Sequence, residues 1–273
     1  MKRTGTLLCV ITLLIALNAY AADSTCTASQ NDLYPYVLLG INTAIRFKKA
    51  EDSVAPDGDI YPITVVEQQC DTGSEKQVAE LPYLGDPGKV ESAFLGDADF
   101  DGISELFVIH RSTLYSDTGT SYGSDYFTTL VYRRWSPEKY ELDERIGNYF
   151  GSGADILSPQ TNDDLIYKHP YKSKAQVESE LGSDRYRAWL EQKFFVTRIM
   201  RKTYLYEQAN TAGKTTSYLV AGDQIQMLDR QAGWLKAVFH NKKGDIRGWI
   251  LCQDTLECLD QSHSTENKKK PVV

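Results

Sequence analysis

Short runs of aromatic and β-branched residues, separated by turns, restrict the fold of this chain more than any other feature. In the first half, the runs cover residues 61–66, 92–95, 106–110, 126–135 and 140–146. Turn residues stand between them, as in Pro56-Asp57-Gly58-Asp59. Regular short strands with such turns are typical of antiparallel sheets. The sequence therefore predicts a mainly β chain, with a meander or propeller-like β-domain over residues 22–150.

The segment 151–193 differs in composition and predicts a loop and helical connector. Glycine and proline are frequent in its first part. Ser173 stands three residues before Gln176, which is the spacing of a capping box at a helix start. Gly182 then interrupts the helix. After it, Tyr186, Trp189 and Leu190 share one helical face, which is expected to pack against a sheet.

Residues 194–258 return to short β runs and predict a small barrel. The runs cover residues 195–200, 203–207, 217–220, 224–228, 234–239 and 247–251. Residues 259–273 contain a basic run at 268–270 and are expected to form a flexible tail.

The N-terminus has the three parts of a secretory signal peptide. Lys2 and Arg3 give a basic start, and Leu7–Leu17 is largely apolar. Ala19-Tyr20-Ala21 then offers small residues to a signal peptidase. The apolar run is shorter than the roughly 20 residues of a membrane-spanning helix. We expect cleavage after Ala21 and a periplasmic or secreted protein with no stable membrane span.

Net charge argues against nucleic acid as a partner. Removal of residues 1–21 changes the formal net charge from −7 to −9. Proteins that bind nucleic acids present basic surfaces, because those surfaces must neutralise phosphates. We therefore expect no nucleic-acid partner.

Four cysteines remain after the signal peptide, and an even number in an oxidising compartment predicts disulfides. They are Cys26, Cys70, Cys252 and Cys258, and three pairings are possible. Proximity in sequence favours Cys26–Cys70 and Cys252–Cys258. A zinc site is the alternative, but the spacings contain no CxxC pair, and no histidine stands near Cys26 or Cys70.

Residues 97–105 have the spacing of a calcium-binding loop. Carboxylates at its first, third and fifth positions can converge on a hard cation, and glycine at the sixth permits a sharp turn. The predicted ligands are Asp97, Asp99, Asp101, the backbone carbonyl of Ile103, and Glu105. An EF-hand would need a glutamate at the twelfth position, where Val108 stands. Because the flanks are apolar, we expect a β-loop-β hairpin; a solvated acidic turn is the alternative.

The C-terminal segment resembles the bacterial SH3-like domain. The resemblance rests on Leu205-Tyr206, Gly222-Asp223, Gly233-Trp234 and Gly248-Trp249, in that order. It implies a barrel closed by the two tryptophans. It also implies an aromatic groove for peptidoglycan stem peptides or proline-rich peptides, with Tyr204, Tyr206 and Tyr218 as candidates. Alternatively, both tryptophans only fill the barrel and bind nothing.

The acidic loop between two strands resembles the calcium loops of FG-GAP or integrin-type propeller repeats. Together with the aromatic strand Tyr126–Tyr132, it resembles a group of bacterial periplasmic proteins. That group includes immunity proteins that block peptidoglycan hydrolases. The resemblance implies a peptidoglycan hydrolase as protein partner, and calcium as the bound ion.

One motif of an enzyme is present, and its context argues against catalysis. Residues 119–123 match GxSxG around Ser121, but a nucleophile elbow needs a strand before the serine and a helix after it. The flanks here are polar and lead into a strand. Residues rich in tyrosine, serine and glycine are instead suited to contact a protein. The predicted partner contacts are Tyr115, Tyr122, Tyr126 and, in the barrel, Tyr206.

The sequence thus predicts a non-enzymatic periplasmic binding protein. Its expected role is that of an immunity or inhibitor protein against a peptidoglycan hydrolase, or that of a cell-wall-binding protein. The alternatives are a secreted cell-wall hydrolase or esterase with an SH3-like targeting domain, which would depend on Ser121, and a structural subunit of the envelope.

Overall fold

The computed structural model shows a mainly β protein, as predicted, with four antiparallel sheets and three short α-helices in its described part. That part comprises residues 26–29, 32–49, 62–113, 121–136, 139–158, 161 and 164–258. The expected signal peptide (residues 1–21), the tail (residues 259–273) and Tyr115 lie outside the described residues and stay predictions.

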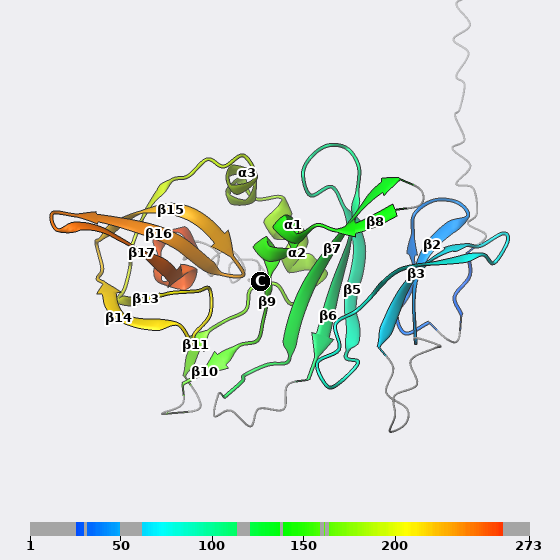
Figure 1. Cartoon of the computed structure of the whole chain (residues 1–273), viewed down its shortest axis with the longest axis horizontal. Helices are drawn as coiled ribbons and strands as arrows, with labels where there is room; N and C mark the ends of the chain where they lie inside the picture. Colours follow the sequence, from blue (N-terminus) through cyan, green and yellow to red (C-terminus); the bar gives the residue numbers. More distant parts are fainter. Residues whose placement is uncertain are drawn as a thin grey trace, which may run out of the picture.

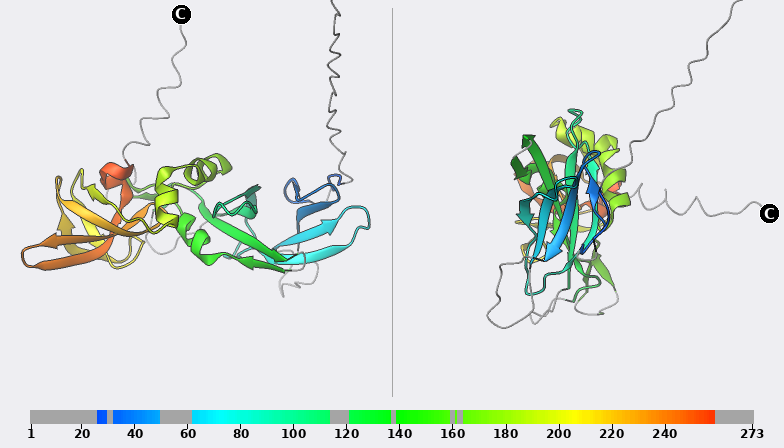
Figure 2. Two further views of the ribbon diagram at one scale, coloured as in Figure 1. Left: turned by 90° about the horizontal axis from the view of Figure 1, so that it is seen from above. Right: turned by 90° about the vertical axis from the view of Figure 1, so that its right-hand side faces the viewer.

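The sheets follow one another along the long axis of the molecule (Figure 1). The N-terminal sheet, in blue and cyan, lies at one end, and the C-terminal sheet, in yellow and orange, lies at the other. The central sheet and the helices stand between them, and a view from above shows the same order (Figure 2).

The N-terminal sheet is a four-stranded meander in the order β1-β2-β3-β4. Its strands are β1 (Val37–Leu38), β2 (Thr43–Lys49), β3 (Ile63–Gln69) and β4 (Glu75–Glu80). Alternate residues of β2 and β3, such as Phe47 and Val65, are buried against the central sheet. Because successive side chains of a strand point to opposite faces, these alternate residues share the face that packs on the central sheet.

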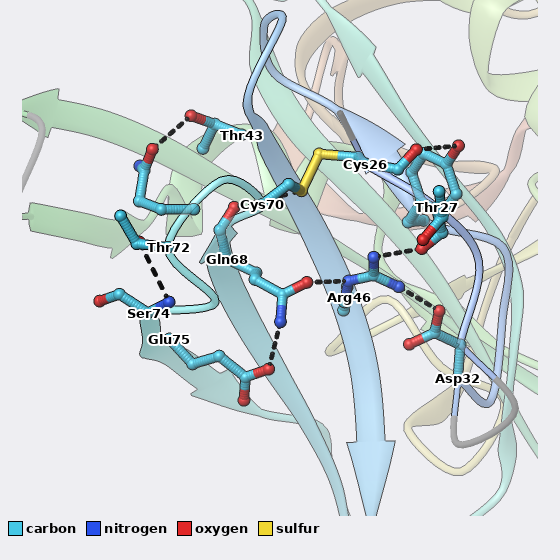
Figure 3. The surroundings of a disulfide bond; sticks show 12 residues. Cys26, Thr27, Asp32, Thr43, Arg46, Gln68, Cys70, Thr72, Ser74 and Glu75 are labelled. Atoms are coloured by element: carbon cyan, nitrogen blue, oxygen red, sulfur yellow. Dashed lines mark hydrogen bonds and ion pairs between the residues drawn. A yellow bond between two sulfur atoms is a disulfide. The ribbon is translucent and has the colours of Figure 1, made fainter. Parts of the chain in front are cut away.

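A disulfide fastens the start of the described chain to this sheet (Figure 3). Cys26 pairs with Cys70, which follows β3, and their Cα atoms are 5.0 Å apart. Beside it, the buried guanidinium of Arg46 donates to Asp32 and to the Thr27 carbonyl. These hydrogen bonds offset much of the free-energy cost of burying the guanidinium charge. The second expected disulfide, Cys252–Cys258, is also present, so both predicted pairings are confirmed.

The central sheet has the order β5-β6-β7-β8, with β9 paired to β7. Its strands are β5 (Lys89–Gly96), β6 (Glu105–Ser112), β7 (Tyr126–Ser136), β8 (Lys139–Leu142) and β9 (Ser152–Gly153). Strand β6 is buried on both faces. Leu106 and Val108 face the N-terminal sheet, whereas Phe107 and Ile109 face the helices. This double burial explains why β6 is a continuous apolar run.

Three short helices cover the second face of the central sheet: α1 (Glu144–Phe150), α2 (Lys174–Leu181) and α3 (Asp184–Leu190). The break between α2 and α3 at Gly182 is as predicted, and Ser183 caps α3 through Tyr186 N at 3.0 Å. Tyr186 and Trp189 are buried in the helix–sheet core, which confirms their predicted packing role.

The prediction of a strand over residues 140–146 is wrong beyond Leu142. Strand β8 ends there, and Asp143 begins helix α1 by accepting a hydrogen bond from Ile146 N at 2.9 Å. An aspartate at this position satisfies a backbone donor that the helix itself leaves free. Ile146 then faces the core between helix and sheet.

The C-terminal sheet has the order β12-β15-β16-β17-β13-β14 and its own apolar core. Its strands are β12 (Val196–Arg198), β13 (Thr203–Tyr206), β14 (Lys214–Leu219), β15 (Gln224–Gln231), β16 (Trp234–Asn241) and β17 (Gly244–Leu251), followed by the 3-10 helix η1 (Cys252–Asp254). Within the described residues, its ladder stays open between the edge strands β12 and β14. The closed barrel expected from the sequence is therefore not formed there.

Aromatic stacking joins the C-terminal sheet to the connector. The connector carries β10 (Ile156–Leu157) and β11 (Leu165–Tyr167). The rings of Tyr167 and Trp234 stack with centroids 5.5 Å apart, and the Tyr167 hydroxyl donates to the Ala232 carbonyl. Ala232 N donates to the carbonyl of Tyr149 in α1 at 2.9 Å. Trp234 is thus a packing residue at a junction.

The part of the chain that the structure describes contains no helix with the length and apolar character needed to span a bilayer.

His169 is fully buried just after β11. Its Nδ1 lies 3.3 Å from the Tyr167 hydroxyl, and its backbone N–H donates to Asp155 at 2.9 Å. Burial, together with the nearby Lys172 ammonium, lowers the pKa of His169 from 6.5 to about 4. The folded protein therefore holds this imidazole neutral where the unfolded chain would protonate it.

We predict that acid weakens the fold through His169. As the pH falls from 6.5 to about 4, only the unfolded state gains the proton, so the free energy of unfolding falls by up to about 3 kcal/mol. Urea unfolding at several pH values measures this slope. His169→Gln should flatten it and His240→Gln, at an exposed site, should not. His110 is also buried with a lowered pKa, so some slope remains in the variant. Equal slopes in the wild type and His169→Gln would contradict the assignment.

Candidate functional site

The acidic loop joins β5 to β6, as the β-loop-β prediction required. The strands pair up to Gly96 and Glu105, and residues 97–104 form the connection. Asp97 holds the turn, because its two carboxylate oxygens accept from Asp101 N at 3.1 Å and Gly102 N at 3.0 Å. Gly102 has φ of 87°, a value that residues with a Cβ rarely adopt.

Three of the five predicted calcium ligands come together in this loop. Carboxylate oxygens of Asp97, Asp99 and Glu105 all lie within 4.8 Å of one another. Hard oxygen ligands of this kind fit calcium. Asp101 is outside this group and its Oδ1 accepts from Ile103 N at 2.7 Å, while the Ile103 side chain is exposed. The donor set therefore fits a divalent cation with three protein carboxylates.

Glu105 is the buried member of the group, with 1% of its surface exposed. Burial raises the pKa of its carboxyl, and the charges of Asp99 and Asp101 raise it further. The hydrogen bond from Ala98 N, at 2.8 Å, opposes this shift because it stabilises the charged form. A cation nearby would therefore stabilise the charged form of this carboxyl group.

Arg133 supplies a cation that the sequence analysis missed. It projects from β7, donates to Asp99 and lies 3.8 Å from Glu105 and 3.3 Å from Asp143. Its guanidinium also lies 5.1 Å from the ring centroid of Trp135, which is 60% exposed. The distance of 34 residues between Arg133 and Asp99 left no local pattern that could reveal this pairing.

A second group of side chains lies on the outer face of the C-terminal sheet. It combines three aromatic rings and three lysines, and we call it the aromatic–lysine face: Tyr204, Tyr218, Trp249, Lys202, Lys214 and Lys236. Tyr218 is 52% exposed and the lysines are all exposed. The face is therefore cationic, although the chain as a whole is acidic, and its lysines and Tyr218 are accessible. Tyr204 and Trp249 are half-buried against the core around Trp234.

Strand register brings these residues onto one face. Lys236 pairs with Trp249, Trp249 with Tyr206, and Tyr206 with Lys214, across β16, β17, β13 and β14. Directly opposed residues of antiparallel strands point to the same face. Lys214 Nζ lies 3.8 Å from the ring centroid of Tyr204, so Tyr204 belongs to the same face.

The two tyrosines of the face form a pair with lysines above them. The rings of Tyr204 and Tyr218 are 6.1 Å apart between centroids and meet edge to face. Lys202 Nζ lies 4.3 Å from the Tyr218 centroid and 5.0 Å from that of Tyr204. Cation–π attraction of this kind holds an ammonium group in place, at about 0.5–1 kcal/mol for an exposed site.

Of the tyrosines predicted to contact a partner, Tyr206 lies inside the molecule. It is 5% exposed, and its ring packs edge-on against Trp234. Tyr122 is 37% exposed and bridges to Ile156. Tyr126 is half-buried, and burial raises its pKa. The structure therefore brings none of these together with Tyr206, whereas Tyr204 and Tyr218 are the tyrosines available on the C-terminal sheet.

Ser121 does not stand in a nucleophile elbow. The chain after it forms a bridge at Tyr122 and enters strand β7, whereas the elbow requires a helix there. Among the described residues, the hydrogen bonds of the histidine rings go to the Pro87 carbonyl, the Tyr167 hydroxyl and Asp245. None of these connects a histidine to Ser121.

Comparisons of the chain with protein-family models, with curated proteins and with solved structures give no match.

Proposed function

We propose that this chain is a non-enzymatic binding protein of the bacterial cell envelope, and that its aromatic–lysine face binds peptidoglycan. The observation that carries the proposal is that strand register gathers three exposed lysines around Tyr204, Tyr218 and Trp249 on one face of the sheet. Aromatic rings offer apolar surface to sugar rings and alkyl chains, and ammonium groups attract carboxylates. Peptidoglycan carries both chemical groups, in its glycan strands and in its stem peptides.

Two further features support an envelope location, and a third supports the ligand class. The N-terminal sequence has the pattern of a cleavable signal peptide. Both disulfides suit an oxidising compartment. The resemblance of residues 196–257 to bacterial SH3-like domains points to the same ligand class.

Sedimentation with purified sacculi tests the proposal. We expect the wild-type protein to sediment with them, and the double variant Lys202→Ala/Lys214→Ala to bind at least about tenfold more weakly, because two charge contacts are lost. Tyr218→Ala should also weaken binding. The matched control is Lys242→Ala/Lys243→Ala, in the exposed turn between β16 and β17, which removes the same charge elsewhere. Equal binding by the two double variants would refute the assignment of this face.

We further propose that Asp97, Asp99 and Glu105 hold a calcium ion that stabilises the β5–β6 hairpin. The arrangement of their carboxylates within 4.8 Å supports this. Because Arg133 already neutralises part of the negative charge, the affinity should be modest. We expect a dissociation constant on the order of 10⁻⁴–10⁻³ M, the range of extracellular calcium modules.

Calorimetric titration of metal-stripped protein measures the calcium affinity. Asp99→Asn should abolish binding, and Asp71→Asn, an exposed control in the β3–β4 turn, should leave it unchanged. Arg133→Met should strengthen binding, because it removes a competing cation from Asp99. Identical heat release in the wild type and in Asp99→Asn would contradict the assignment of the calcium site.

A second candidate function is inhibition of a peptidoglycan hydrolase through the surface at Trp135. An exposed tryptophan with a guanidinium over its ring is the type of residue pair that dominates protein interfaces.

An inhibition assay tests this second candidate. Muramidase digestion of sacculi should slow at near-equal molar amounts of the protein, and Trp135→Ala should lose at least about tenfold in inhibitory potency. Lys202→Ala/Lys214→Ala should inhibit as the wild type does, which separates this surface from wall binding. Undiminished digestion with the wild-type protein would remove the candidate for that enzyme class.

A further inference from the structure

The guanidinium of Arg230 is buried in the C-terminal sheet, where it contacts a disulfide. The side chain of Arg230 is 2% exposed. Within the described residues, the hydrogen bonds of its guanidinium go from Nη2 to the sulfur atoms of Cys252 and Cys258, each at 2.9 Å. Nε and Nη1 are buried and form no hydrogen bond there. Because sulfur is a weak acceptor, these contacts compensate poorly for the burial of a full positive charge.

The carboxylates near Arg230 leave room for a closer counter-ion. Glu257 Oε1 lies 3.7 Å from Arg230 Nη1, which is an ion pair without a hydrogen bond. The charge of Arg230 also acts on three groups in the helix–sheet core: Glu180, Tyr149 and Tyr171. Glu180 already accepts hydrogen bonds from Arg185, and burial raises the pKa of both tyrosines, so they stay protonated. A negative charge on either sulfur would lie nearer to Arg230 than the Glu257 carboxylate does.

The two sulfurs differ in their access to solvent. Cys252 is 1% exposed and belongs to the apolar core of the C-terminal sheet, whereas Cys258 is half-buried. In thiol–disulfide exchange, a thiolate attacks a sulfur that it can reach, and a stabilised thiolate leaves faster. Burial in apolar surroundings disfavours a thiolate, and a neighbouring guanidinium favours it. An external thiol can thus reach Cys258, while Arg230 stabilises the thiolate that leaves on Cys252.

We propose that Cys252–Cys258 is a redox-active disulfide that exchanges with thiol reductants, with Cys258 as the attacked sulfur and Cys252 as the leaving thiolate. The first external thiolate forms a bond to Cys258 Sγ, and the electron pair of the broken S–S bond passes to Cys252 Sγ beside Arg230. A second thiolate then attacks the external sulfur of the mixed disulfide and releases Cys258, which takes up a proton. Two thiols are oxidised to one disulfide, and the protein disulfide is reduced by two electrons. The proposal does not depend on the proposed function.

The other disulfide has a different environment and provides an internal control. Beside Cys26–Cys70, the hydrogen bonds of the Arg46 guanidinium go to oxygen atoms of Asp32, Gln68 and Thr27 (Figure 3). That cation is therefore already compensated, and a thiolate there would gain less from it.

The C-terminal sheet should keep its fold when Cys252–Cys258 is reduced. The two cysteines are 6 residues apart, whereas those of the other disulfide are 44 residues apart. In the loop-entropy account, a short loop restricts the unfolded chain less and so contributes less to stability. Hydrogen bonds also hold the segment after β17: Met200 N donates to Asp254 O, and Gln253 Nε2 donates to Ile166 O, each at 2.8 Å.

The test equilibrates the full chain with mixtures of reduced and oxidised glutathione. Free thiols are then alkylated and located by peptide mass spectrometry. The equilibrium constant for reduction of Cys252–Cys258 should be at least about tenfold larger than that of Cys26–Cys70, a difference of about 30 mV in reduction potential. The mixed disulfide with glutathione should be found on Cys258.

Variants of Arg230 test the role of its charge. Arg230→Met should lower the equilibrium constant for reduction of Cys252–Cys258 by about tenfold or more at neutral pH, and Arg230→Lys should stay within about threefold of the wild type. The matched control Arg201→Met, which removes a 62% exposed cation paired with Asp254, should change it by less than about twofold. In the reduced wild type, ultraviolet absorbance should show a thiolate whose pKa lies below the usual value of about 8.5. In reduced Arg230→Met, that pKa should lie above it.

Glu257→Gln gives a test that does not require a change at the buried arginine. Removal of the competing carboxylate should raise the equilibrium constant by about threefold or more, and this variant decides the matter if the melting curve shows that Arg230→Met does not fold. Three outcomes would overturn the proposal: reduction of Cys26–Cys70 first, glutathione bound to Cys252, or an unchanged equilibrium constant in folded Arg230→Met. An unchanged or lowered constant in Glu257→Gln would overturn it as well.

Discussion

Burial of strand β6 on both faces is the constraint on which the rest of the first half depends. One face of β6 packs on the N-terminal sheet through Leu106 and Val108, and the other packs on the helices through Phe107 and Ile109. Because interiors are close-packed, neither layer can shift without opening voids against this strand. The acidic loop precedes β6 directly, and Glu105, one of its three clustered carboxylates, is the first residue of this doubly buried strand. That rigidity suits a fixed set of carboxylates on a hairpin.

Much of the architecture could be predicted from local patterns. Turn residues and aromatic or β-branched runs placed most strands, and Gly182 placed the break between two helices. The register that creates the aromatic–lysine face could not be predicted, because it pairs β13 with both β14 and the distant β17. Helix α1 was not predicted, because residues 140–146 have the composition of a strand. The capping side chain of Asp143 is the local sign that a helix starts there. The open ladder of the C-terminal sheet could not be predicted either, because closure of the sheet depends on pairing between strands that are far apart in sequence.

The candidate sites also differ in whether a local sequence pattern could reveal them. The loop carboxylates were found because their spacing is local, and three of them do meet in space. Arg133 was missed because its partners are brought to it by the pairing of β6 with β7. Tyr206 was expected to be accessible, yet the junction with Trp234 buries it. Local spacing thus identified the chemistry of single segments, whereas exposure and charge balance depended on tertiary contacts.

The carboxylate of Asp143 interacts with two groups at once. One of its oxygens caps α1 through Ile146 N, and the other lies 3.3 Å from Arg133, which also contacts Asp99 and Glu105. A negative charge at a helix start is favourable, and a guanidinium that draws on the same carboxylate weakens that benefit. How Arg133 is shared among the three acids therefore sets part of the strength of the α1 cap. Since the Tyr149 carbonyl of α1 accepts a hydrogen bond from Ala232 N, a chain of direct contacts links the acidic loop, through helix α1, to the turn before β16.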